Sequence, residues 1–258
     1  MWLENRCRPR AHWGVSIAYA VFSLTWLAAG ASAAQEPEIY AAIRKLGGVV
    51  EADESVRGKT SVAVDLSQTA VTDDDLKQLA DLSDLHELRL GFTEITDAGL
   101  AHLATMSDLK RLYLSGTKVT DAGLAHLNGL TQLEALSLWN TPITDAGLVH
   151  LAGLNQLRQV WLSFTPIGDA GLAHFSGKAE LRELYLGHTR VTGAGLAHLA
   201  DSKKLAVLVL TETRVGDSGL APIKGFKQLR TVNLGGSKVS EKGMQELQGA
   251  LPRTQVVR

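Results

Sequence analysis

A repeat of 24 residues constrains the fold of this chain more than any other feature of its sequence. Leucine returns at the same position of seven successive copies without an insertion, as Leu85, Leu109, Leu133, Leu157, Leu181, Leu205 and Leu229. Each copy opens with Leu-x-x-Leu-x-Leu, in which Val160 and Val232 replace the middle leucine. Internal repeats of about 20–50 residues indicate a solenoid. The chain therefore predicts one continuous structure whose size depends on repeat number.

Each repeat predicts a strand, a turn and a short helix. Leu88 and Leu90 alternate with Arg89, the period-2 pattern of a strand with one buried face. The Thr-Asp-Ala-Gly-Leu segment predicts a helix with Thr96 as its N-cap and Asp97 in its first turn, where a negative charge suits the helix dipole. The corresponding N-cap candidates are Thr120, Thr144 and Thr192.

A column of hydroxyl residues follows the predicted strands. It consists of Thr69, Thr93, Thr117, Thr141, Thr165, Thr189, Thr213 and Ser237. Equivalent nucleophiles without a partnered base serve no chemistry. We therefore expect each hydroxyl to turn inward and bond backbone groups that the turn leaves unpaired.

The full pattern, Leu-x-x-Leu-x-Leu-x-x-Thr-x-Ile-Thr-Asp-x-Gly-Leu-x-x-Leu, resembles the leucine-rich repeat. Its Thr-Asp-x-Gly-Leu segment is similar to repeats of F-box-associated proteins and of many bacterial ones. The resemblance covers about residues 60–250. It implies a right-handed α/β solenoid with a parallel β-sheet on its concave face and short helices on its convex face. Because strands lie about 4.8 Å apart and helices about 8–10 Å, the coil must bend toward the sheet.

The N-terminus predicts an export signal. Arginines precede an apolar run from Trp13 to Gly30, and Ala31, Ser32 and Ala33 follow it. We expect residues 1–33 to be a signal peptide, so that the mature protein is periplasmic, on the cell surface or extracellular. An uncleaved N-terminal membrane anchor is the alternative, because the apolar run approaches the minimum spanning length. Cleavage removes Cys7, the single cysteine, and with it any disulfide or thiolate site.

The rest of the chain divides by its patterns. Residues 34–60 predict a linker and an N-terminal cap, residues 61–250 about eight repeats, and residues 251–258 a C-terminal cap strand. Terminal units of a solenoid are atypical because they must shield an open end of the core.

Aromatic residues gather on the outward face of the predicted sheet. They make up 5% of the chain, yet six of them fall on this face. Large rings are enriched at binding hot spots. The expected ligand-binding surface consists of Arg89, Phe92, Tyr113, Trp139, Trp161, Phe164, Tyr185 and His188. The alternative is that rings merely suit a pleated surface and pack on one another.

Five histidines form a second column, His102, His126, His150, His174 and His198. Zinc ligands must converge to about 2.0–2.1 Å from one ion, whereas adjacent helices repeat at about 8–10 Å. We therefore expect surface or inter-helix packing positions and no metal. No nucleophile elbow, phosphate-binding loop or zinc-protease motif occurs, so we expect neither a cofactor nor enzymatic activity.

These patterns predict an exported, monomeric recognition module that binds a protein through its concave face and has no membrane span after signal cleavage. The formal charge of −1 gives no argument for nucleic acid as a partner. Carbohydrate or cell-wall binding by the same rings is the alternative. Substrate recognition in an F-box-like ubiquitin ligase is a weaker one, because an export signal conflicts with a cytosolic ligase. Protein binding itself is implied by analogy of fold.

Overall fold

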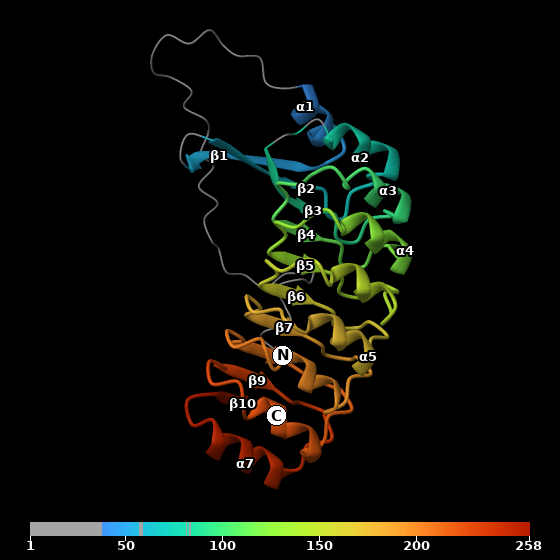
Figure 1. Ribbon diagram of the computed structural model, residues 1–258. Helices are drawn as coiled ribbons and strands as arrows, with labels where there is room; N and C mark the ends of the chain where they lie inside the picture. Colours follow the sequence, from blue (N-terminus) through green and yellow to red (C-terminus); the bar gives the residue numbers. More distant parts are fainter. Residues whose placement is uncertain (1–37, 57–58, 81, 83) are drawn as a thin grey trace, which may run out of the picture.

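The computed structural model describes residues 38–56, 59–80, 82 and 84–258. The predicted signal peptide and the start of the predicted linker lie outside these residues. Strands stack along one side of the molecule and helices along the other (Figure 1). The ten strands of the described residues form one sheet, ordered as they occur in the chain. Among the described residues, no helix combines the length and apolar character needed to cross a membrane.

The repeats pair in parallel with a constant register. Leu88, Leu112 and Leu136 lie opposite one another on adjacent strands. Residues 24 apart in sequence are therefore neighbours in space, and each sequence column becomes a row across the sheet. The strands of the parallel sheet are β2 (Lys59–Asp65), β3 (Leu85–Arg89), β4 (Arg111–Tyr113), β5 (Ala135–Ser137), β6 (Gln159–Trp161), β7 (Glu183–Tyr185), β8 (Val207–Val209), β9 (Thr231–Asn233) and β10 (Gln255–Val257).

The opposite side carries short α and 3₁₀ helices. They are α2 (Asp73–Leu79), α3 (Asp97–Ala101), α4 (Asp121–Leu124), η2 (Ala125–Leu127), η3 (Gly147–Leu151), α5 (Asp169–Leu172), η4 (Ala173–Phe175), η5 (Gly195–Leu199), η6 (Asp217–Gly219), α6 (Leu220–Ile223) and α7 (Glu241–Ala250). The core fills the space between the two sides. Leu88, Leu90, Ile95, Leu100 and Leu103 of the second repeat are all 0% exposed. Burial of one such side chain contributes about 1.5–3 kcal/mol.

Two of the four predicted N-caps are wrong. Thr96 caps α3 through its hydroxyl and Thr120 holds the N-cap position of α4 without a side-chain cap bond, but the helices of the fourth and sixth repeats begin at Gly147 and Gly195. Those segments wind as 3₁₀ helices, a tighter form used in short pieces. The hydroxyl at Thr144 still accepts the Ala146 N–H at 3.2 Å, so it bonds the turn before the helix rather than the helix itself.

The hydroxyl column has the structural role that the sequence predicts. Thr93 Oγ1 donates to the carbonyl of Leu90 at 2.6 Å, where the strand ends. The same bond to the residue three positions earlier recurs in Thr69, Thr117, Thr141, Thr165, Thr189 and Thr213. These hydroxyls therefore stabilise the turn that follows each strand.

The aspartate column joins successive repeats, a role that the sequence analysis missed. Asp97 Oδ1 accepts the Thr120 N–H at 2.7 Å, and its Oδ2 accepts the Thr120 hydroxyl at 2.6 Å. A Cβ on Gly123 would collide with the Asp97 carboxylate, so glycine is required beneath it. Each Thr-Asp-Ala-Gly-Leu segment thus receives the carboxylate of one neighbour and offers its own to the next.

The two ends differ from the repeats. Helix α1 (Glu38–Lys45) packs against β1 (Val49–Val56), which pairs with β2 in the antiparallel sense. The parallel sheet of the repeats is therefore preceded, within the predicted N-terminal cap, by one antiparallel strand. Two residues separate β1 from β2, and a connection this short permits only antiparallel pairing. At the other end, β10 continues the parallel register beside β9.

Candidate ligand-binding surface

The constant register places the expected site residues in two rows on the concave face. The central row contains Arg89, Tyr113, Trp161 and Tyr185, which lie on strands β3, β4, β6 and β7. The rings of Tyr113 and Trp161 have centroids 5.9 Å apart, across the small residue Ser137. Trp161 and Tyr185 stack at 5.4 Å and 12°. The rings in this row are therefore in contact along its length.

The central row forms a second apolar cluster outside the main core. Trp161 is 5% exposed and Tyr185 3%, and they pack with Ala135 and Val209. Tyr113 is half-buried at the edge of this cluster. The two most central rings therefore present little surface, and the accessible aromatic surface lies to their side.

A second row of rings follows the ends of the strands; we name Phe92, Trp139, Phe164 and His188 the strand-end row. Trp139 meets Phe92 at 5.8 Å and 58°, and Phe164 at 5.3 Å and 64°. Phe164 stacks on His188 at 4.1 Å and 20°. The first three rings are half-buried and His188 is exposed. This row is continuous and partly open to solvent.

Trp139 is the exception in its own sequence column. The equivalent positions hold small residues, namely Ser67, Gly91, Ser115, Ser163, Gly187, Thr211 and Gly235. A Cβ on Gly116 would lie 2.8 Å from the Phe92 ring, so this ring packs over the glycine and also contacts Trp139. The small residues at the positions equivalent to Trp139 therefore leave space for the rings of the strand-end row.

The other members of the strand-end row have an unusual backbone. Phe92, Phe164 and His188 have φ of 57°, 61° and 55°, in the left-handed region. The position recurs every 24 residues and also holds Gln68, Gly116, Asn140, Glu212 and Gly236. A bulky side chain at positive φ is a genuine outlier. Glycine and asparagine at three of the eight positions, Gly116, Asn140 and Gly236, were the sequence signal for this backbone, and the sequence analysis missed it.

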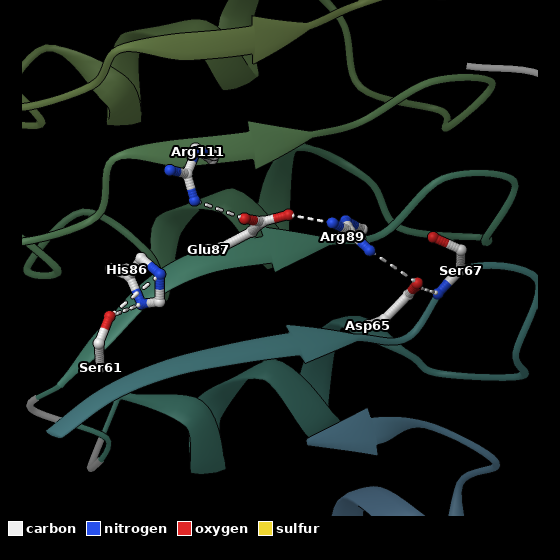
Figure 2. A network of polar contacts seen from close by, with 7 residues as sticks. All are labelled: Ser61, Asp65, Ser67, His86, Glu87, Arg89 and Arg111. Carbon is white, nitrogen blue, oxygen red and sulfur yellow. Dashed lines mark hydrogen bonds and ion pairs between the residues drawn. The ribbon is translucent and has the colours of Figure 1, made fainter. Parts of the chain in front are cut away.

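A charged network occupies the N-terminal end of the same face (Figure 2). Arg89 forms an ion pair with Glu87 and lies 3.6 Å from Asp65, while Arg111 Nη1 donates to Glu87 at 2.8 Å. The Arg89 guanidinium also lies 5.7 Å from the centroid of Tyr113. Burial works to lower the pKa of Arg89, but the carboxylates of Glu87 and Asp65 raise it above its ordinary value. Carboxylates therefore dominate the local potential.

The histidine column lies away from both rows, on the helical side. His126, His150, His174 and His198 belong to η2, η3, η4 and η5, and His102 follows α3. His198 is exposed and the other four are half-buried. Within the described ranges, no three histidine, cysteine or acidic side chains are grouped to hold a metal ion.

Comparison with known proteins agrees with the fold described above. Residues 82–104 match the sequence model for "Leucine Rich repeat". Internalin C2 of Listeria monocytogenes superposes with a TM-score of 0.63 at 22% identity, over 86% of this chain and 92% of that one. No curated protein matches the sequence. The repeat motif, the ordered sheet and the structural match together show that the chain has the leucine-rich-repeat fold.

Proposed function

We propose that this protein is a non-enzymatic module that binds another polypeptide through its concave face, with the strand-end row at the centre of the contact. The observation that carries this proposal is the left-handed backbone beneath Phe92, Phe164 and His188. Such conformations cost about 1–3 kcal/mol each and gather at binding and catalytic sites. Gly116 and Gly236 occupy the same column, so the fold accepts the unstrained residue. Rings stand at three of these positions and are joined through Trp139 into one continuous row, which favours a role for their surface.

The ring geometry favours a polypeptide over a glycan. A sugar stacks on an open, flat ring face. Phe92, Trp139 and Phe164 meet at 58° and 64°, while Phe164 and His188 cover one another's faces at 20°. Tilted rings with crevices between them suit side chains of a partner, and aromatic anchors dominate protein interfaces. Glycan binding is therefore kept as an outcome of the test.

The polar groups give no support to an enzyme. Ser61 Oγ lies 2.8 Å from Nδ1 and 3.1 Å from Nε2 of His86, the kind of contact that a nucleophile and its base would make (Figure 2). Both ring nitrogens face the same hydroxyl. Among the described residues no carboxylate hydrogen-bonds to this ring, so the third member that orients a catalytic histidine is missing. We infer a structural contact between β2 and β3.

The proposal includes export and a monomeric state. The basic start, the apolar run and Ala31-Ser32-Ala33 support cleavage after Ala33. The intact mass of the protein purified from its host measures this: a chain starting at Ala34 is expected, and an uncleaved chain would favour the membrane-anchored alternative. Sedimentation of the same sample reports the oligomeric state, and a stable dimer would contradict the monomer.

A phage-displayed library of random peptides tests the binding surface. The parent protein is expected to enrich discrete sequences. Trp139→Ser, which matches its column to Ser115 and Ser163, and Phe164→Gly are expected to weaken the selected peptides about tenfold or more, the loss typical of a hot spot. Phe164→Gly loses ring packing worth about 0.5–1.5 kcal/mol per pair but relieves the backbone, so the fold should persist.

Gln68→Gly is the matched control, because it makes the same backbone change outside the strand-end row. It should leave peptide affinity unchanged. Equal affinity of the parent and both ring variants would place the contact elsewhere and overturn the proposal. Failure to enrich peptides, together with retention on polysaccharide, would favour the glycan alternative.

A further inference from the structure

A hollow of about 300 Å³ opens on the concave face at its N-terminal corner, away from the strand-end row. It is lined by Val49, Glu51, Ala63, Val64, Asp65, Glu87 and Arg89. Glu51, Ala63 and Glu87 lie opposite one another on β1, β2 and β3. Because Ala63 is small, a gap remains between the two glutamates. The antiparallel strand β1, absent from the repeat pattern, supplies the outer wall.

The charges around the hollow are unbalanced. Three carboxylates and one guanidinium line it and give a formal charge of −2, and Arg111 beside it reduces the negative charge only to −1. Both Glu87 oxygens are engaged, by Arg89 and by Arg111. Asp65 accepts the Ser67 N–H and lies 3.6 Å from Arg89. The guanidinium groups of Arg89 and Arg111 are therefore already paired with carboxylates of this network.

Glu51 is the carboxylate left over. It is exposed, and in the described part of the chain no cation pairs with it. Val49 on the same strand is 54% exposed, which is unusual for a large apolar side chain here. Its Cα lies opposite Asp65, and Glu51 is two residues further along the same strand, so one apolar side chain and two carboxylates border the opening together. An aliphatic stem with a cationic head fits both features.

We propose that this hollow binds a lysine or arginine side chain of the polypeptide that the concave face takes up, with Glu51 and Asp65 as acceptors and Val49 against the aliphatic stem. A volume of about 300 Å³ is at the lower end for ligand pockets and suits one side chain. The inference rests on the proposed function only in assigning that side chain to a polypeptide. Charge-assisted contacts of this kind set the register of a partner.

Small probes test the hollow without a partner. N-acetyl-L-arginine methylamide and its lysine analogue are titrated into ¹⁵N-labelled protein, with the neutral glutamine analogue and N-acetyl-L-glutamate methylamide as comparisons. The cationic probes are expected to shift the backbone amides of Ala63, Asp65, Glu87 and Arg89 saturably, with weaker binding at higher salt. Equal shifts with the glutamine analogue, or stronger binding of the glutamate probe, would overturn the proposal.

Isosteric variants locate the effect. Glu51→Gln/Asp65→Asn removes two charges, while the amide oxygen introduced by Asp65→Asn can still accept the Ser67 N–H. The double variant is expected to weaken binding of the arginine probe about tenfold. Glu94→Gln, at an exposed carboxylate that pairs with Lys118 outside the hollow, should have no effect. An unchanged titration in the double variant, with unchanged thermal unfolding, would refute the site.

Trp139→Ser separates this proposal from the proposed function. The variant should bind the arginine probe as the parent does, because Trp139 does not line the hollow. If the probe binds but no peptide is selected, the hollow stands and the polypeptide-binding proposal fails. If peptides are selected without any preference for basic residues and the probe does not bind, the polypeptide-binding proposal stands and the proposal for the hollow fails.

Discussion

Lys178 is a charged residue in a column that otherwise belongs mostly to the core. The equivalent positions hold Leu82, Met106, Leu130, Leu154, Ser202 and Phe226. Lys178 is 1% exposed, and its Nζ donates to the Ala152 carbonyl at 2.5 Å. Burial lowers its pKa from 10.5 to about 8. Because the unfolded chain keeps the proton up to about pH 10.5, the unfolded state binds more protons between pH 8 and 10.5, and stability should rise with pH across that window.

Replacement of Lys178 by methionine should therefore stabilise the fold at pH 7, by about 1–2 kcal/mol, because exchange of a buried charge for a similar apolar side chain often does so. The advantage should shrink between pH 8 and 10.5, where native Lys178 becomes neutral. Urea unfolding at pH 7 and pH 10 measures both effects. Lys204→Met, at an exposed lysine, is the control. An advantage of equal size at the two pH values would show that burial of charge is not its source.

Individual residues also show which structural features could be predicted from the sequence and which could not. The alternation of Leu88 and Leu90 with Arg89 predicted buried and outward positions, because periodicity records which face is buried. The left-handed backbone at Phe92 and Phe164 is recorded only in other copies of the repeat, where Gly116, Asn140 and Gly236 hold the equivalent position. Positive φ is recognised in a sequence through glycine or asparagine. A phenylalanine there gives the opposite signal, so the strand-end row was predicted as rings on a surface but not as strained ones.

At the scale of elements, the bonds between aspartate and threonine hold the helical side together. Asp121 Oδ1 accepts the Thr144 N–H at 2.7 Å and Oδ2 the hydroxyl at 2.5 Å. Hydrogen bonds to a charged group contribute about 1.5–3 kcal/mol. Asp121→Ala should therefore lower the free energy of unfolding by about 2–3 kcal/mol, as measured by urea titration. Asp201→Ala, at an exposed carboxylate without such a bond, should change it by less than about 0.5 kcal/mol. Equal effects would contradict the role of the inter-repeat bond.

The position of this aspartate was predictable from the sequence, but its main partner was not. A carboxylate in the first turn satisfies the helix dipole within its own repeat, so the sequence pattern had a sufficient local explanation. The second partner lies 23 residues away, at Thr120 for Asp97. Only the register between repeats brings the two together. The same holds for the network of Glu87, Arg89 and Arg111, which spans two strands.

At the scale of the whole solenoid, one junction between the repeats that the structure describes, that of the sixth and seventh, lacks this bond. Gly193 replaces the aspartate in the sixth repeat and Gly216 the threonine in the seventh, and a Cβ on Gly193 would collide with the backbone of Gly219. On either side the bonds are present, from Asp169 to Thr192 and from Asp217 to Ser240. Each repeat of a solenoid is stabilised mainly through its neighbours, so one weak interface divides the cooperative unit.

We therefore expect the chain beyond Gly216 to open as a unit before the repeats that precede it. Hydrogen exchange followed by mass spectrometry in mild urea should show lower protection from β9 to β10 than from β4 to β6, with the change at the junction of the sixth and seventh repeats. Asp145→Gly removes the bond to the Gly168 N–H and should add a second boundary between the fourth and fifth repeats. Protection that declines smoothly toward both ends, with no step at either glycine, would mean that the leucine core and the strand register alone set the cooperativity of this solenoid.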